Sequence, residues 1–251
     1  MNKKIGEIQK ELEQATGIER ARLCEEYASD LRTGVQKLLL KYRRQEERLR
    51  LERERLDGMR LYERKYADCT WICGIDEAGR GPLAGPVVAG AVILPKDCEI
   101  LYLNDSKKLS PKRREMLYEE IMEKAIASGI GMASPERIDE INILQATYEA
   151  MREAVGKLGI VPDILLNDAV KIPQVSIRQV PIIKGDEKSV SIAAASILAK
   201  VTRDHLMIAY DEQYPEYGFA SHKGYGSAFH MEAIRRYGPS PIHRKSFLTK
   251  M

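Results

Sequence analysis

Residues 71–94 read WICGIDEAGRGPLAGPVVAGAVIL, and this stretch decides the fold. Its two ends, residues 71–75 and 86–94, are apolar runs rich in β-branched residues, and the segment between them is rich in glycine and proline. Apolar runs that are bounded by turn residues are typical of β-strands. We therefore expect an early hairpin of two strands, with Asp76 and Glu77 directly after the first strand.

Strands and helices alternate after this hairpin. Ser110-Pro111 and Ser134-Pro135 each place a serine before a proline, which is a common start of a helix. We expect helices over residues 110–128, 143–158, 189–210 and 228–237, and strands over residues 129–133, 163–167 and 176–183. The pattern predicts an α/β fold with a mixed central sheet flanked by helices.

The first 68 residues differ from the rest, since they contain no proline and carry helical charge patterns. We expect a helical, charged N-terminal extension over residues 1–68 and a catalytic domain over residues 69–251 with a helical C-terminal part. Between residues 41 and 66, ten Lys and Arg stand against six Asp and Glu. A solvated helix with Glu–Arg pairs is the simplest interpretation, and a contact with a duplex backbone is the alternative. The role of the extension stays open.

Composition sets limits on location and partners. A hydrophobic fraction of 44% with 31% charged residues is that of a globular protein, and the net charge of +3 permits nucleic-acid binding without requiring it. We found no secretion signal and no apolar run near the ~18 residues of a membrane span, so we expect a cytoplasmic protein. The four cysteines are scattered, and we expect them to be reduced, without zinc.

Four acids follow predicted strands: Asp76, Glu77, Asp168 and Asp186. Carboxylates at the ends of strands face the edge of the sheet where α/β proteins assemble their sites. Acids that converge raise one another's pKa unless cations neutralise them, and hard oxygen ligands favour Mg²⁺ or Mn²⁺. Two such ions, about 3.5–4 Å apart, support hydrolysis of a phosphodiester without a histidine or a nucleophilic side chain.

The loop after the first acids is rich in glycine, which lets backbone N–H groups approach a phosphate. Gly79, Gly81 and Gly85 miss the spacing of a dinucleotide-binding fingerprint, and Pro82 interrupts any helix start. The sequence also lacks the Gly-Lys-Ser/Thr of a phosphate-binding P-loop. Taken alone, this loop is either a phosphate contact or a tight turn between strands.

Several motifs in a fixed order resemble those of bacterial ribonuclease HII. They are GIDEAGRGPLAGPVVA at residues 74–89, DSKKLS at 105–110, Asp168 after its strand, KGDEKS at 184–189, SIAAASILAKVTRD at 191–204, KGYG at 223–226 and GPSPIH at 238–243. The resemblance covers residues 71 to about 248. It implies a ribonuclease H-like fold and a two-metal site of Mg²⁺ or Mn²⁺.

The resemblance also implies roles for the four acids. Asp76 would bridge both metals and Asp186 would support the ion that activates water. Glu77 and Asp168 would serve the other ion.

Substrate contacts are carried over in the same way. Gly79, Arg80 and Gly81 would meet the ribose 2′-hydroxyl and a neighbouring phosphate, and Tyr225 would also touch the 2′-hydroxyl and stack on the next sugar. The 2′-hydroxyl is the group that separates RNA from DNA at a site. The cationic side chains of the matched motifs would face phosphates: Lys107, Lys108, Lys184, Lys188, Lys200, Arg203 and Lys223. The four histidines, His205, His222, His230 and His243, are interpreted as structural or phosphate-facing.

The predicted function is metal-dependent endoribonuclease activity. The enzyme would hydrolyse the RNA strand of RNA–DNA hybrids and incise 5′ of single ribonucleotides in duplex DNA, leaving a 3′-hydroxyl and a 5′-phosphate, during replication and repair. We expect a monomer with no membrane partner. Two alternatives stay open: a nuclease of the same fold that acts on branched DNA, and a hybrid-binding module without activity.

Two positions depart from the family pattern. Asn167 precedes Asp168 where the family tends to be apolar, so its side chain either tilts that carboxylate or forms a hydrogen bond at the strand end. Ser227 replaces a commoner threonine. The preferred metal and recruitment by a replication clamp stay open.

Overall fold

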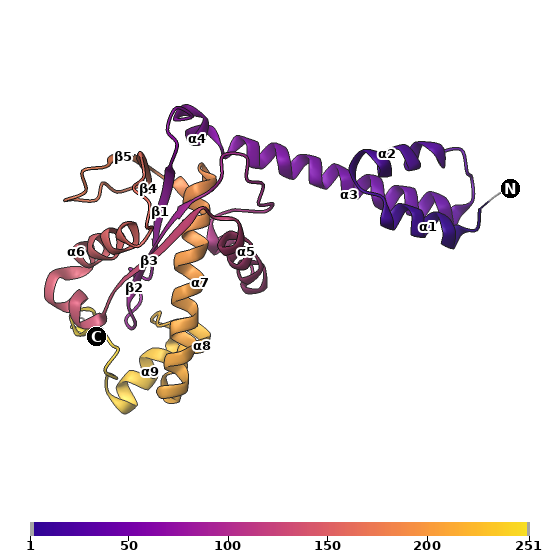
Figure 1. Cartoon of the computed structure of the whole chain (residues 1–251). Helices are drawn as coiled ribbons and strands as arrows, with labels where there is room; N and C mark the ends of the chain where they lie inside the picture. The colour runs from indigo at the N-terminus through magenta and orange to yellow at the C-terminus, as the bar shows by residue number, and fades with distance from the viewer. Residues whose placement is uncertain (1–2, 250–251) are drawn as a thin grey trace. The chain divides into compact units, whose positions relative to one another are not determined.

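The computed structural model describes residues 3–249, and contacts between Cα atoms divide the chain into two units, residues 1–57 and 58–251. The first unit contains α1 (Ile5–Gln14), α2 (Gly17–Glu26) and most of α3 (Thr33–Gly58) (Figure 1). These helices form a small core of their own, made of Ile8, Leu12, Cys24, Val35, Leu39 and Tyr42. The expected helical character of the N-terminal region is confirmed.

Ion pairs line the charged part of α3. Arg50 contacts Glu47 at 2.8 Å and Glu54 at 2.5 Å, and Arg55 contacts Glu52 at 2.6 Å. These partners lie three or four residues apart, where side chains on a helix surface meet. The expected Glu–Arg pairs are confirmed along this part of α3, and a contact with a duplex backbone stays a prediction.

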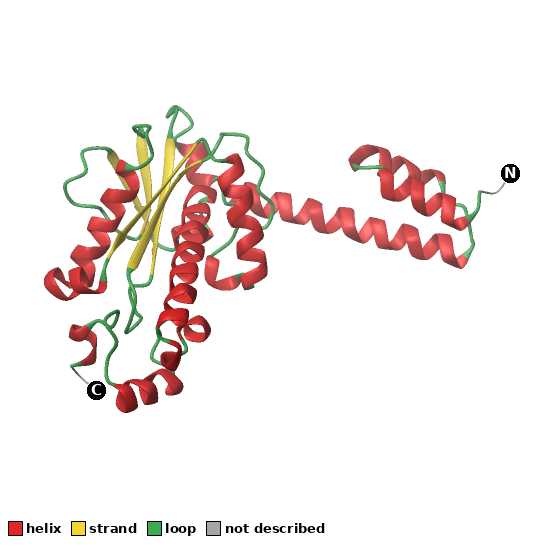
Figure 2. Cartoon of the chain, turned by 60° about the horizontal axis from the view of Figure 1, so that its bottom comes forward, coloured by secondary structure: helices red, strands yellow, loops and turns green. Residues whose placement is uncertain are grey.

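A five-stranded sheet in the order β3-β2-β1-β4-β5 forms the centre of the second unit. β1 (Ile72–Ala78), β2 (Val87–Ile93) and β3 (Ala127–Ala133) pair antiparallel, whereas β4 (Ile164–Asp168) and β5 (Arg178–Ile182) continue from β1 in parallel. Figure 2 shows helices on both faces of this sheet. The predicted mixed sheet is confirmed, including the early hairpin.

Two long helices cover the sheet. α6 (Pro135–Gly156) packs on one face, and α7 (Val190–Gln213) packs on β1 and β2 from the other. Glycines allow this close approach: a Cβ at Gly74 would lie 2.1 Å from the backbone of Ser191 in α7. The remaining elements are α4 (Leu61–Lys65), η1 (Ser106–Lys108), α5 (Pro111–Lys124), η2 (Gly185–Glu187), η3 (Pro215–Tyr217), α8 (Phe219–His222), α9 (Ala228–Tyr237) and α10 (Lys245–Leu248).

The predicted helix starts are largely confirmed. The hydroxyls of Ser110, Ser134 and Ser189 each accept a hydrogen bond from a backbone N–H in the first turn of α5, α6 and α7. α6 consists of two helical segments that meet at a kink, because Asn142 (φ 67°, ψ 163°) is not helical. The first segment begins at Pro135 after Ser134, and the second begins at residue 143, as expected, where Asn142 Oδ1 accepts the N–H groups of Leu144 and Gln145. α5 ends at Lys124, four residues earlier than expected, because β3 begins at Ala127.

Two strand ends were predicted too early. β1 continues through Asp76 and Glu77 because these residues pair with Gly90 and Ala89 of β2. β4 includes Asp168, which pairs with Ile182 of β5. Acidic residues are rare in strands, so their presence led us to end both predicted strands too early. The hydrogen bonds to the neighbouring strands outweigh this preference. No helix within residues 3–249 is both long and apolar enough to cross a membrane.

Candidate active site

The four acids come from three elements that meet at one edge of the sheet. Asp76 and Glu77 lie near the end of β1, and Asp168 is the last residue of the parallel neighbour β4. Asp186 lies in η2, which leads from β5 into α7. Asp76 and Asp186 are buried, with exposed fractions of 6% and 8%.

Burial and repulsion by neighbouring acids disfavour the charged forms of Asp76 and Asp186. Burial raises the pKa of Asp76 well above its usual range, and the charges of Glu77, Asp168 and Asp186 raise it further. Burial likewise raises the pKa of Asp186 to about 6, with further contributions from Asp105 and Asp168. Such a cluster is a strong candidate for a functional site, since cations would relieve its cost.

The carboxylates are held by local hydrogen bonds. Asp76 accepts the N–H of Glu77 at 2.7 Å, and Asp168 accepts the N–H of Gly185 at 2.7 Å. Glu77 forms an ion pair with Arg80 at 3.3 Å, which opposes the rise in the Glu77 pKa that burial causes. Within residues 3–249, no three His, Cys, Asp or Glu side chains are arranged so that they could together hold a metal ion. The hard oxygen donors suit Mg²⁺ or Mn²⁺, but their spacing would have to tighten around it.

A cleft of about 440 Å³ opens beside these acids. Nine of the predicted site residues line it: Asp76, Glu77, Gly79, Arg80, Gly81, Lys107, Lys200, Arg203 and Tyr225. Burial disfavours the charge of Lys107, but nearby acids, Asp105 and Asp76 foremost, raise its pKa overall. Asp168 and Asp186 act on this cluster through their charges and do not line the cleft.

A second hollow of about 300 Å³ shares Arg114, Lys200 and Tyr225 with the cleft. Lys223 lines this hollow and not the cleft itself. Lys184 lines neither: it is exposed and has a left-handed backbone (φ 56°) just before η2. The structure therefore brings Lys223 near the cleft and leaves Lys184 beside Asp186 along the chain.

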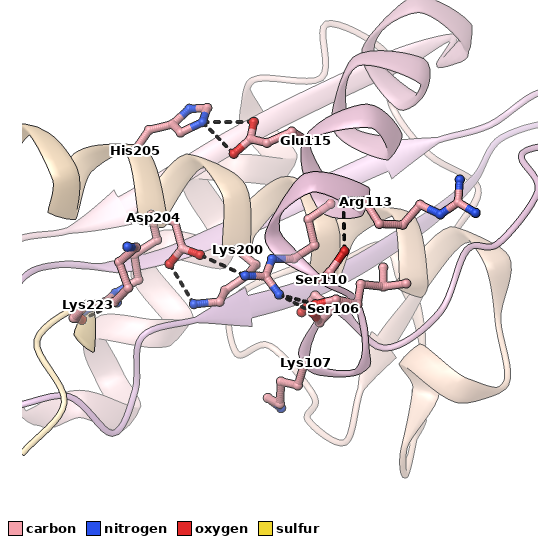
Figure 3. A network of polar contacts seen from close by, with 12 residues as sticks. Ser106, Lys107, Ser110, Arg113, Glu115, Lys200, Asp204, His205 and Lys223 are labelled. Carbon is pink, nitrogen blue, oxygen red and sulfur yellow. Dashed lines mark hydrogen bonds and ion pairs between the residues drawn. The ribbon is translucent and has the colours of Figure 1, made fainter. Parts of the chain in front are cut away.

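A partly buried network of ion pairs on α7 connects this helix to α5 through Arg114 (Figure 3). Asp204 contacts Lys200 at 2.6 Å and Arg114 at 3.5 Å. Arg114 also donates to the carbonyls of Ser106 and Leu109, which fixes the turn that carries Lys107. In Figure 3, the Lys107 side chain points away from this network.

The expectation that all the motif cations face phosphates needs correction. Arg203 is buried, with an exposed fraction of 1%, and donates to the carbonyls of Ala84, Pro86 and Lys223. Lys108 pairs with Glu187 at 2.5 Å, and Lys188 donates to the carbonyl of Ile183. A single sequence cannot separate a solvated cation from one that binds carbonyls far along the chain.

Two family models match the chain, one over each of its parts. The family model described as Ribonuclease HII matches residues 73–250, and the one described as Ribonuclease HII N-terminal domain matches residues 4–67. The chain belongs to the ribonuclease HII family. Ribonuclease HII enzymes are ribonuclease H endonucleases that act on RNA–DNA hybrids, so the alternative of a binding module without activity is set aside.

Relatives named Ribonuclease HII match over most of their length. The protein from Lachnoclostridium phytofermentans is 64% identical over 251 residues, covering 100% of this chain and 99% of the relative. The one from Clostridioides difficile is 56% identical over 221 residues, covering 87% of each. Among solved structures, the ribonuclease H2 from Pyrococcus horikoshii OT3 gives a TM-score of 0.60 at 28% identity, covering 70% of this chain and 93% of that one. The predicted ribonuclease H-like fold is confirmed.

The histidines of this ribonuclease HII differ in their surroundings. His230 and His243 are buried and His222 is half-buried, whereas His205 is exposed and contacts Glu115 at 3.0 Å. His222 contacts the carbonyl of Tyr217 at 2.8 Å. The structural interpretation is confirmed for His222, His230 and His243.

Asn167 forms hydrogen bonds at the end of β4. Its Nδ2 donates to Gln179 Oε1 at 2.8 Å and to the carbonyl of Val170 at 3.1 Å. Of the two interpretations of this departure from the family pattern, the hydrogen bond at the strand end is confirmed. Ser227 keeps the capping function of a hydroxyl residue, since it accepts the N–H of His230 at the start of α9.

Sequence reasoning missed Glu63, which lies on α4 near the start of α7. Its Oε1 accepts the hydroxyl of Ser189 at 2.5 Å and the N–H of Ser191 at 3.0 Å. Ser189 in turn donates its N–H to the carbonyl of Gly185, beside Asp186. Ser189 and Ser191 lie 126 and 128 residues from Glu63, so no local signal revealed the contact.

We expect Glu63→Ala to destabilise the catalytic unit. Both donors that Glu63 accepts would be left unpaired in a buried setting, which costs about 2 kcal/mol of the free energy of unfolding. Urea unfolding followed by fluorescence of Trp71, the single tryptophan, measures this unit. Replacing the exposed Glu119 of α5 by alanine serves as the matched control. A loss no larger than that of the control would contradict the expectation.

Proposed function

We propose that this ribonuclease HII incises 5′ of single ribonucleotides embedded in duplex DNA and also hydrolyses the RNA strand of RNA–DNA hybrids, leaving a 3′-hydroxyl and a 5′-phosphate. Its role would be ribonucleotide removal during replication and repair, as a cytoplasmic monomer. The observation that carries the proposal is one cleft lined by Asp76, Glu77, residues 79–81 and Tyr225. Acids for phosphodiester chemistry and groups able to read a ribose thus share one space.

Asp76, Glu77, Asp168 and Asp186 would hold Mg²⁺ or Mn²⁺. Their oxygens are hard donors, and the raised pKa values of Asp76 and Asp186 support a site at which positive charge would stabilise the cluster. When bound, two such ions supply an activated water and stabilise the departing oxygen of the phosphodiester. Glu77 would exchange its ion pair with Arg80 for a metal, which would free the Arg80 guanidinium for the substrate.

Residues of the cleft would position the scissile strand. The half-exposed ring of Tyr225 offers a flat apolar surface for a sugar, and the backbone of Gly79, Arg80 and Gly81 offers polar groups for the 2′-hydroxyl and a phosphate. Lys107, beside the acids, would neutralise a phosphate that enters the cleft. Lys223 in the adjoining hollow and Lys184 near Asp186 would contact phosphates further along the strand.

Cleavage of a DNA duplex that contains one ribonucleotide tests the proposal. We expect a cut on the 5′ side of the ribonucleotide with Mg²⁺ or Mn²⁺, and no cut in EDTA or in an all-DNA duplex. Tyr225→Ala should raise KM about tenfold, because stacking on an aromatic side chain contributes about 1–3 kcal/mol. An RNA–DNA hybrid and a branched all-DNA substrate complete the set. Cutting of the hybrid alone would refute junction reading, and cutting of the branched DNA would favour the alternative nuclease.

A further inference from the structure

Two loops form the rim of the cleft and touch each other through their backbones. We call residues 79–86 the glycine loop and residues 222–227 the tyrosine loop. The N–H of Leu83 donates to the carbonyl of Gly224 at 2.8 Å. Gly224 has φ +85°, and a Cβ at this position would lie 2.5 Å from the carbonyl oxygen of Ala84. The loops are therefore packed as closely as their backbones permit.

Two buried arginines hold the glycine loop from behind. Arg203 joins both loops, through the carbonyls of Ala84 and Pro86 on one side and of Lys223 on the other. Arg244, with an exposed fraction of 0%, donates to the carbonyls of Gly79, Arg80 and Gly85 at 2.5–3.0 Å. Both guanidinium groups donate these hydrogen bonds to backbone carbonyls, so each side chain acts as a clamp on the main chain.

A chain of two histidines holds the tyrosine loop. The carbonyl of Tyr225 lies 2.8 Å from His230 Nδ1, and His230 Nε2 lies 2.9 Å from His243 Nε2. At the far end, the N–H of Ser240 donates to His243 Nδ1 at 2.8 Å.

The positions of the protons on the two histidine rings follow from the groups at the two ends of this chain of hydrogen bonds, the carbonyl of Tyr225 and the N–H of Ser240. A carbonyl only accepts and a backbone N–H only donates, so His230 carries its proton on Nδ1 and His243 carries its proton on Nε2. His243 then donates to His230 between them. Both rings are neutral, and each of these four nitrogens has one defined role.

We propose that His230, His243 and Arg244 are positioning residues that hold the tyrosine loop and the glycine loop at a fixed separation. His243 and Arg244 are consecutive, so the segment that clamps Gly79 and Arg80 also fixes the hydrogen-bond chain to Tyr225. This inference rests on the proposed function, in which both loops contact the same ribose. Groups from two loops can contact one sugar together only if the distance between the loops is fixed. A small displacement of either loop would weaken binding of the ribose.

His230→Asn breaks the chain at its middle. The asparagine amide can replace Nδ1 as the donor to Tyr225, but it provides no acceptor at the place of Nε2, so the bond to His243 is lost. We expect KM for the duplex with one ribonucleotide to rise about tenfold while kcat changes less than about threefold, because the catalytic acids stay in place. Arg244→Lys should give the same pattern, since lysine keeps the charge but cannot reach three carbonyls.

His205→Asn is the matched control, because His205 is exposed and lies outside the chain of hydrogen bonds. Steady-state kinetics should be paired with melting temperatures of all variants, so that loss of fold is separated from loss of position. Folded His230→Asn and Arg244→Lys proteins with wild-type KM would overturn the proposal, as would an equal loss in kcat and kcat/KM.

The proposed substrate specificity can be wrong while the positioning role is right, and the two are tested separately. If the wild-type enzyme cuts hybrids but leaves the duplex with one ribonucleotide intact, the same variants are compared on the hybrid, where a 2′-hydroxyl is also present. A rise in KM there supports the positioning role without the junction, and an unchanged KM overturns it.

Discussion

Asp76→Asn is expected to lower the rate of cleavage by about 10³-fold, the order of loss seen when one group that stabilises charge in a transition state is removed. Asp76 is the most buried of the four acids whose fit to a divalent ion underlies the proposal, and asparagine keeps its shape while removing its charge. Single-turnover cleavage of the ribonucleotide duplex at saturating Mn²⁺ measures the loss. Asp97→Asn, a change at an exposed loop residue, is the control.

Binding of metal gives a second readout of the same variant. Burial and three neighbouring acids disfavour the charge of Asp76. Asp76→Asn removes this charge and should therefore raise the melting temperature of the metal-free protein. Added Mn²⁺ should stabilise the wild-type protein by mass action and stabilise Asp76→Asn much less. Wild-type cleavage by the variant, or an equal response of both proteins to Mn²⁺, would remove Asp76 from the metal site.

The sequence predicted those features that depend on local chemistry. Runs of β-branched residues predicted β1 and β2, short apolar runs between helices predicted the other three strands, and serines before helices predicted the starts of α5 and α7. The parallel pairing of β1 with β4 then explains why Asp76 and Asp168, far apart in sequence, meet at one edge of the sheet. Pairing between strands also explains the errors at their ends, because hydrogen bonds to a neighbour extended β1 and β4 through residues that disfavour strands.

The contacts that support the candidate site could not be predicted from local patterns. Arg203 and Arg244 resemble surface cations in sequence, yet both are buried on carbonyls of the glycine loop, 117–165 residues away. Glu63 was counted only among the charges of a solvated helix, although it holds the start of α7. In each case the partners lie far along the chain, and apart from the Ser189 hydroxyl they are backbone atoms, which leave no sign in the amino-acid sequence.

The buried histidine pair predicts a dependence of stability on pH that a single variant can isolate. Burial lowers the pKa of His243 from 6.5 to about 4, so the folded state excludes a proton that the unfolded state accepts. Stability from the neutral His243 is therefore complete above pH 6.5 and is lost as the pH falls toward 4. At pH 5 the loss is about 2 kcal/mol, from the same two pKa values.

Asp186 changes the stability in the opposite direction as the pH falls. A measurement on the wild-type protein alone would therefore not reveal the loss caused by His243. Its pKa is raised from 3.8 to about 6, so protonation between these values favours the folded state. The difference in stability between the wild-type protein and His243→Gln cancels the contribution of Asp186, because both proteins keep this residue. Glutamine does not titrate, and its amide can still donate to His230.

The destabilisation caused by His243→Gln should therefore shrink by about 2 kcal/mol between pH 7.5 and pH 5, since only the wild-type protein loses stability from this position. Urea unfolding followed by Trp71 fluorescence at the two pH values measures it, with His205→Gln, a change at an exposed histidine, as the control. An effect of His243→Gln that is the same at both pH values would show that His243 takes up a proton in the folded state as readily as in the unfolded one. Neutral rings could then no longer connect Ser240 to Tyr225 through defined donors and acceptors, and the chain of hydrogen bonds behind the cleft would have to be assigned differently.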